Sequence, residues 1–321
     1  RDSVIVYRTI SYGLVSSGIR TDLALESREL NPDIEGVEEQ TEERERMTVS
    51  RIKITDRTAA EKLDKPIGKY VTLDAPELCN RPLDLFEQMS AALSEELYNM
   101  FTGLKDDATV LVVGLGNRSI TSDSLGPRVA ERIYVTRHVT EYMPDALPGT
   151  VRSVCSVAPG VLGVTGIETM EIVRGVKEYA KPDMIIAIDA LASRRAARIN
   201  TTIQLTDTGI SPGSGIGNNR KGLNSEAFGV PVIAIGVPLV VHAATITQEV
   251  ISLIADKTGL HGDEEKLKGL AEQVISENLG QMVVTPKDID SIVEDMSGII
   301  ATGINMALFG KSFEDVRMLI A

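Results

Sequence analysis

A strand–helix alternation that begins at Thr109 constrains the fold of this chain more than any other feature. Short apolar runs bounded by turn residues are typical of buried strands in a parallel sheet, and amphipathic stretches separate them here. The alternation predicts right-handed βαβ units, and hence a three-layer α/β/α sandwich around a mostly parallel sheet. We expect strands at 109–113, 151–155, 183–188 and 231–236, and helices at about 125–137, 166–180 and 245–256.

The segments on either side of this alternation are predicted to be an N-terminal arm and C-terminal helices. Residues 1–30 show no regular hydrophobic period. Between Glu26 and Arg46 lie nine acidic and three basic residues, too much charge to bury, so we expect an inserted, solvated loop or helix. Further expected elements are strands at 49–54 and 69–73, a helix from Pro82 with Leu85, Met89, Leu93, Leu97 and Phe101 on one face, and helices at 263–278 and from Thr285-Pro286.

The composition narrows the classes of partner and compartment. The formal net charge is −13, which argues against a broad surface for nucleic acid or for an anionic membrane. The two cysteines, Cys79 and Cys155, favour free thiols in a reducing compartment. No run reaches the roughly 18 continuous apolar residues of a membrane span. The N-terminal run at 4–7 is too short for the core of a signal peptide. We therefore expect a cytoplasmic protein.

Two aspartates at the ends of predicted strands are the strongest candidates for chemistry. Asp123 lies in SITSDSLG and Asp189 in AIDALAS. Because ligands collect beyond the carboxyl ends of the strands in open α/β sheets, both should meet at one edge. Two adjacent carboxylates retain one proton between them, so one can activate a water as general base while the other acts as general acid. Alternatively, Asp123 caps a helix near Leu125 and Asp189 accepts backbone hydrogen bonds.

The glycine-rich segments do not fit the motifs that they superficially match. The GLG at 114–116 lacks the third glycine of a dinucleotide-binding fingerprint. The GISPG at 209–213 looks like a nucleophile elbow, but Pro212 has no backbone N–H for an oxyanion hole. The same region lacks the Ser or Thr that follows the lysine of a P-loop. A polar glycine loop as long as 209–224 is predicted to bind or gate a substrate.

His242 is the one histidine with a suggestive position, after the predicted strand at 231–236. With Asp123 and Asp189 it would make a triad of oxygen and imidazole ligands for a metal. The alternative is a structural histidine at the start of a helix. The residues leave both interpretations open.

Five motifs make the chain resemble the germination proteases of spore-forming bacteria, an unusual family of aspartic endopeptidases. The resemblance extends from about Arg20 to the C-terminus and depends on VVGLGN, SDSLGP, IDALASR, SPGSGIGNNRK and IAIGVP. It implies that Asp123 and Asp189 are the catalytic aspartates. It also implies an α/β/α sandwich shared with hydrogenase-maturation endopeptidases, a homotetramer, synthesis as a zymogen, and small acid-soluble spore proteins as substrates in the forespore or spore core.

The resemblance gives the N-terminal arm a meaning as well. Family substrates are cut after the acid of a Thr-Glu-(Phe or Ile)-Ala sequence, and Thr21-Asp22-Leu23-Ala24 has the same character. It implies autoprocessing between Asp22 and Leu23, with residues 1–22 as a pro-segment and 23–321 as one peptidase domain. An ordinary capped helix start is the alternative. Many family members have an acidic residue at the position of His242 in this chain. We expect that the protein requires no cofactor or metal.

Basic residues near the predicted site are candidates for binding the acidic residue of the substrate. They are Arg194, Arg220 and Lys221, whose side chains suit a carboxylate. Two other functions stay open from the sequence. One is a metal-dependent endopeptidase of the hydrogenase-maturation type, which would use His242. The other is a non-enzymatic binding module whose aspartates are helix caps.

Overall fold

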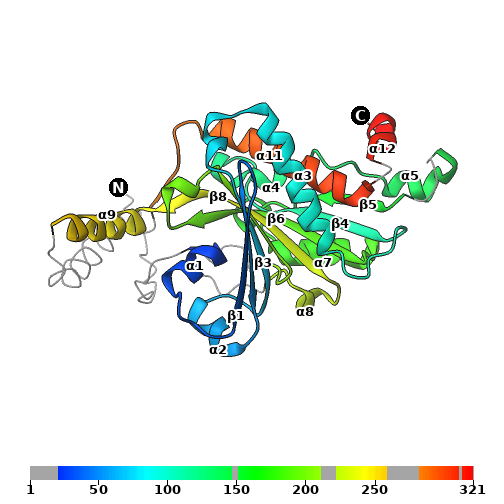
Figure 1. The fold of residues 1–321 in the computed structure, drawn as a ribbon. Helices are drawn as coiled ribbons and strands as arrows, with labels where there is room; N and C mark the ends of the chain where they lie inside the picture. The colour runs from blue at the N-terminus through cyan, green and yellow to red at the C-terminus, as the bar shows by residue number, and fades with distance from the viewer. Residues whose placement is uncertain (1–20, 147–150, 211–221, 259–281, 311–312, 321) are drawn as a thin grey trace, which may run out of the picture.

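The computed structural model describes residues 21–146, 151–210, 222–258, 282–310 and 313–320, which form a mixed α/β structure (Figure 1). Within these residues, nine strands form one sheet in the order β1-β2-β3-β7-β8-β6-β4-β5, with β9 beside β8. The strands are β1 (Val37–Glu43), β2 (Thr48–Ile54), β3 (Gly68–Asp74), β4 (Thr109–Gly114), β5 (Ser153–Val157), β6 (Met184–Ser193), β7 (Thr202–Thr206), β8 (Val232–His242) and β9 (Val283–Val284).

The described helices surround this sheet. The α-helices are α1 (Ala24–Leu30), α2 (Arg57–Leu63), α3 (Leu83–Asn99), α4 (Leu125–Ala130), α5 (Arg137–Tyr142), α6 (Leu162–Thr165), α7 (Thr169–Ala180), α8 (Ser225–Phe228), α9 (Ala243–Thr258), α11 (Ile289–Phe309) and α12 (Phe313–Ile320). Short 3₁₀ helices are η1 (Pro76–Asn80), η2 (Thr121–Asp123), η3 (Pro144–Ala146) and η4 (Ala196–Arg198).

The sheet has a parallel half and an antiparallel half. β4 pairs in parallel with β5 and β6, and β6 pairs in parallel with β8. β7, β3, β2 and β1 continue the sheet with antiparallel pairing. The predicted α/β sandwich is confirmed, and the parallel half is the part that the strand–helix alternation predicted. β1 and β7 were not predicted.

Helices cover both faces of the sheet. Figure 1 shows α3, α4 and α11 on one side, where their apolar side chains form the largest core with alternate residues of the strands. On the other side, α7 and α8 pack against β4 and β6, and α1 and α2 pack against β2 and β3. The predicted apolar stripe of α3 is confirmed: Leu85, Met89, Leu93 and Leu97 are fully buried. Each such side chain contributes about 1.5–3 kcal/mol through burial.

α11 is a core helix despite its length. The helix has 21 residues, and an 18-residue window within it has a mean hydropathy of 1.3, so it is long and apolar enough for a membrane span. However, 72% of the apolar window is buried inside the protein, and the helix packs against α3 and α4. The helix begins at Ile289, not at the predicted Thr285, whose hydroxyl instead donates to Leu239 O at 3.0 Å.

The acidic stretch at 26–46 does not form the predicted solvated loop or single helix. It forms part of α1 and then the edge strand β1, which pairs with β2 from Val37↔Ile54 to Glu43↔Thr48. Most of the charged side chains of β1 are exposed, and charge on an edge strand discourages pairing with other molecules. Glu26 is fully buried, because the donors described below compensate its charge.

Several boundaries also differ from the prediction. β6 and β8 run on past 188 and 236, because their pairing continues to Ser193↔Val241 through an irregularity at Leu191/Ala192. Asp189 therefore lies inside a strand, not in a loop after it. The helix predicted at 125–137 is shorter than expected, because α4 ends at Ala130 and α5 begins only at Arg137. The helix predicted at 166–180 is confirmed by α7, which begins at Thr169. The predicted helix at 263–278 lies outside the described residues.

Candidate active site

Two glycines at the end of β4 allow the segment that carries Asp123 to fold back onto the strand. Gly116 has φ +115°, and a Cβ there would lie 2.0 Å from Asp123 O. A Cβ on Gly114 would lie 2.1 Å from Gly126 O at the start of α4. Neither approach leaves room for a side chain, so these glycines serve close packing and position Asp123.

Asp123 ends the 3₁₀ helix η2 and is half-buried. Its Oδ2 accepts a hydrogen bond from Asn117 N at 2.8 Å. Burial raises the pKa of the Asp123 carboxyl, and the Asn117 N–H opposes that effect. The capping alternative for Asp123 is wrong, because the N-cap of α4 is Ser124 and no side chain caps that helix.

Asp189 lies one residue beyond the last residue of β6 that pairs with β4. That last pair is Gly114↔Ile188, and Asp189 itself pairs with Gly236 of β8. Burial is the largest cause that raises the pKa of Asp189 to about 8, and the Asp123 carboxylate is the second. Its Oδ1 accepts a hydrogen bond from Ala190 N at 2.9 Å, which lowers the pKa by less. The backbone bond expected for Asp189 is therefore formed, and Asp189 is also electrostatically coupled to Asp123.

The pair that results can hold one proton near neutral pH. A neighbouring negative charge disfavours a second ionisation, so two coupled carboxyl groups release their protons at separate pH values. η2 also contacts β6 directly, so the elements that carry Asp123 and Asp189 are adjacent. A carboxylate beside a carboxylic acid can take a proton from water and give one to a leaving group.

The predicted processing sequence lies against the same strand. Asp22 N donates to Ala192 O at 2.9 Å, and Ala192 N donates to Asp22 Oδ2 at 2.7 Å. Asp22 is also one of the charges that raise the pKa of Asp189. The helix α1 does begin here, with Leu23 as its N-cap, but no side chain caps it. Leu23 is fully buried, so the chain on both sides of the Asp22–Leu23 bond is held in place.

The cation that the structure places near Asp22 is Lys65, which is none of the three predicted basic residues. Arg194 lies beside α1, where its Nη2 is 3.9 Å from Glu29 Oε2. Arg220 and Lys221 lie outside the described residues. Lys65 donates from Nζ to Thr21 O at 3.0 Å, and its pKa is lowered by burial while Asp22 acts to raise it. Nothing in the sequence around Lys65 signals this position, because only the tertiary structure brings it to the arm.

The predicted metal triad is not formed. His242 ends β8, six residues beyond the Gly236 that pairs with Asp189. At about 3.3 Å per strand residue, that separation is roughly 20 Å along the sheet. In the parts of the chain that the structure describes, no three His, Cys, Asp or Glu side chains gather as a metal site would require.

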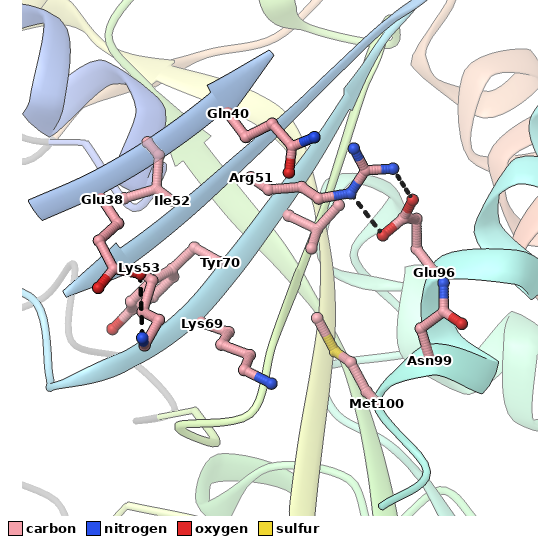
Figure 2. Close-up of a pocket in the computed structure, with 11 residues that line it drawn as sticks. Glu38, Gln40, Arg51, Ile52, Lys53, Lys69, Tyr70, Glu96, Asn99 and Met100 are labelled. Carbon is pink, nitrogen blue, oxygen red and sulfur yellow. Dashed lines mark hydrogen bonds and ion pairs between the residues drawn. The ribbon is translucent and has the colours of Figure 1, made fainter. Parts of the chain in front are cut away.

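A pocket elsewhere on the molecule has no connection with the aspartates. Figure 2 shows it over the antiparallel strands and the end of α3, where Arg51 Nε donates to Glu96 Oε2 at 3.1 Å. Lys53 and Glu38 form a second ion pair of 3.0 Å there. The remaining residues around the pocket are Gln40, Ile52, Lys69, Tyr70, Val71, Asn99 and Met100. Four of its charged groups thus form two ion pairs, and no predicted site residue lines it.

Comparison with known proteins gives one consistent result. The sequence profile of a family described as "Germination protease" matches residues 19–264 and 257–318. A germination protease of Caldanaerobacter subterraneus subsp. tengcongensis is 46% identical over 92% of this chain and 95% of its own length. A germination protease of Clostridium perfringens is 45% identical over 90% of this chain and 95% of its own length. A germination protease of Bacillus cytotoxicus is 37% identical over 92% of this chain and 95% of its own length.

Proposed function

Since this chain belongs to the germination protease family and is therefore a peptidase of spore germination, we propose that it is an aspartic endopeptidase made as a self-processing zymogen. Asp123 and Asp189 form the catalytic pair. The observation that carries the proposal is the contact between η2, which ends at Asp123, and β6, which carries Asp189; burial and the Asp123 carboxylate there raise the pKa of Asp189 to about 8. A carboxyl group in that state keeps its proton at neutral pH beside an ionised partner.

The two aspartates then have different roles. Asp189 is the acid, because a pKa of about 8 keeps its carboxyl group protonated at neutral pH. Asp123 is the base, which takes a proton from a water molecule as the water oxygen adds to the carbonyl carbon. Asp189 gives its proton to the leaving nitrogen as the C–N bond breaks. No covalent enzyme intermediate is needed.

The bond that the zymogen cuts in itself is Asp22–Leu23, and residues 1–22 are the pro-segment. The contacts of Asp22 with Ala192 support this choice, because they hold the bond beside the strand that carries Asp189. By the resemblance of its motifs to the family, the mature enzyme cuts small acid-soluble spore proteins, works in the cytoplasm of the forespore or spore, and assembles as a homotetramer.

The two rival functions receive less support. A hydrogenase-maturation type of site would use His242 together with the aspartates, and the strand register separates them by roughly 20 Å. A binding module whose aspartates cap helices would need a capping bond from Asp123, and α4 has no such side-chain bond.

The experiment that tests the proposal is an incubation of purified full-length Asp123→Asn followed by mass spectrometry. We expect a folded protein that keeps residues 1–22, whereas the wild-type chain loses them. Asp145→Asn is the matched control, because Asp145 is exposed and lies outside the site. Loss of the pro-segment by Asp123→Asn at the wild-type rate would refute the aspartate mechanism.

A further inference from the structure

The side chain of Gln204 contacts the chain on both sides of the Asp22–Leu23 bond. Its Nε2 donates to Asp22 O at 3.2 Å, and its Oε1 accepts from Ala24 N at 2.7 Å. The orientation of the amide is fixed by these partners, because a backbone carbonyl only accepts and a backbone N–H only donates. Gln204 is only 6% exposed, so water competes little for either bond.

Strand register places Gln204 level with Asp189. Gln204 of β7 pairs with Gly236 of β8, and Gly236 pairs on its other side with Asp189 of β6. Residues in register on neighbouring strands have their side chains on the same face of a sheet. The row therefore presents a carboxyl group and an amide to one face, separated by a residue that has no side chain. α1 and the Asp22–Leu23 bond lie over that face.

We infer that Gln204 is a further catalytic residue, which holds the carbonyl oxygen of the bond to be cut and stabilises it when it becomes negatively charged. The inference rests on the proposed function in one respect, since it takes Asp22–Leu23 as the bond that is cut. A hydrogen-bond donor that is already aimed at the oxygen needs no reorganisation as charge develops there.

The proposed reaction balances in atoms and electrons. The oxygen of a water molecule bonds to the carbonyl carbon of Asp22, and the water proton passes to Asp123. The electron pair of the C=O bond moves to the oxygen, where the Gln204 N–H stabilises it. When that pair returns, the C–N bond breaks, and Asp189 supplies the proton that the nitrogen of Leu23 needs.

The same amide also fixes the register of the segment that is cut. Ala24 is 1% exposed and Leu23 is fully buried, so the chain after the bond is held by burial as well as by Gln204 Oε1. Before the bond, Lys65 Nζ holds Thr21 O at 3.0 Å. Among these contacts, the N–H of Gln204 Nε2 is the side-chain donor to the carbonyl oxygen of Asp22 itself. Loss of this N–H would therefore affect the reaction more than the docking of α1.

Two substitutions separate the catalytic role from a purely structural one. Gln204→Glu keeps an oxygen that accepts from Ala24 N but loses the N–H donor to Asp22 O. Gln204→Met has a similar length and loses both bonds. The matched control is Thr206→Val, since Thr206 lies two residues along the same face of β7, is equally 6% exposed, and bonds to Thr208 Oγ1 at 2.9 Å.

The rate of self-cleavage is measured by mass in the full-length chain, and amide hydrogen exchange of α1 reports whether the segment stays docked. We expect both Gln204 variants to cleave about 10²- to 10³-fold more slowly than the wild type. In Gln204→Glu, α1 should stay protected, and the rate relative to wild type should rise as pH falls, because a protonated carboxyl group can donate. Thr206→Val should cleave at the wild-type rate.

The outcomes distinguish this inference from the proposed function. Cleavage by Gln204→Glu at the wild-type rate, while Asp123→Asn stays uncleaved, would overturn the inference alone. Slow cleavage that accompanies loss of α1 protection in both Gln204 variants would also overturn it, because Gln204 would then only dock the segment. Cleavage by Asp123→Asn would refute the proposed function, whatever Gln204 does.

Discussion

Asp189 and Glu26 are two carboxyl groups in confined surroundings, and the protein treats them in opposite ways. Asp189 has Asp123 and Asp22 as charged neighbours, and its pKa is raised to about 8. In the part of the chain that the structure describes, no Lys or Arg is among the causes that shift the pKa of Asp189. Glu26, at 0% exposure, accepts from Arg194 N at 2.6 Å and Arg195 N at 3.0 Å.

The difference shows two ways of keeping a carboxyl group away from water. A buried charge needs donors or a counter-ion, and without them the group takes up a proton instead. Glu26 has both, since Arg198 Nε lies 3.4 Å from it. That arrangement anchors α1, and with it the chain after the Asp22–Leu23 bond. Asp189 has one backbone donor and acidic neighbours, an arrangement that suits proton transfer.

The largest loss of stability should come from removing the charge of Glu26, the anchor of α1. We expect Glu26→Gln to destabilise the protein by about 3 kcal/mol. This value is at the low end for breaking a buried ion pair, because Arg198 would still form its ion pair of 2.6 Å with Glu29. The amide nitrogen that replaces one oxygen would also face backbone donors. Urea unfolding of the full-length chain measures the loss, and hydrogen exchange of α1 locates it.

The control for this substitution is Glu61→Gln, which removes an exposed i,i+4 pair with Arg57. Surface pairs of that kind contribute about 0–1 kcal/mol. If Glu26→Gln were as mild as the control, the buried network would not be the anchor of α1.

Asp189→Asn, in contrast, should increase the free energy of unfolding above that of the wild type. The pKa of Asp189 is about 8 in the folded protein and about 3.9 in an unfolded chain, so the folded state binds more protons between these values. The wild-type stability therefore falls as pH rises through that window, whereas the neutral amide avoids the loss. Each pKa unit corresponds to about 1.4 kcal/mol and the window spans about four units, so the upper bound of the gain by pH 8 is about 5 kcal/mol.

Unfolding of uncleaved protein at several pH values measures this gain. The difference between Asp189→Asn and wild type should vanish near pH 4 and reach its maximum near pH 8. A difference that does not vary with pH would mean that the carboxyl group is ionised in the folded state.

The last prediction needs no substitution and concerns how the rate of self-cleavage by the wild-type protein depends on pH. If Asp189 must be protonated to act as the acid, self-cleavage should fall to half of its maximum near pH 8 and about tenfold for each further pH unit. The rate measured by mass across pH 6–10 tests this. A rate that keeps rising above pH 9 would exclude Asp189 as the proton donor.

The sequence predicted the parallel half of the fold better than the antiparallel half. The apolar runs of β4, β6 and β8 are buried on both faces and are therefore visible as continuous hydrophobic stretches. β1 carries mostly exposed acidic side chains and β7 is rich in buried threonines with Gln204, so neither has such a signature. Their pairing partners, and not their own residues, make them strands.

For the candidate site, the sequence identified both aspartates and the Asp22–Leu23 segment but not the groups around them. Lys65 and Gln204 belong to elements far from Asp22 in the chain, and no local motif marks them. Arg194 was expected to bind a substrate acid, yet it lies beside Glu29 of α1. The role of Arg194 in substrate binding, like those of Arg220 and Lys221, stays a prediction.

The sequence by itself determined the layers of the sandwich, the two aspartates and the family, because periodicity and short motifs are local properties of the chain. Only the tertiary structure decided that Asp189 holds its proton to about pH 8, that Glu26 is anchored, and that Gln204 reaches the backbone beside Leu23. The physical reason is that desolvation, charge coupling and strand register depend on residues distant in sequence, which folding alone brings together.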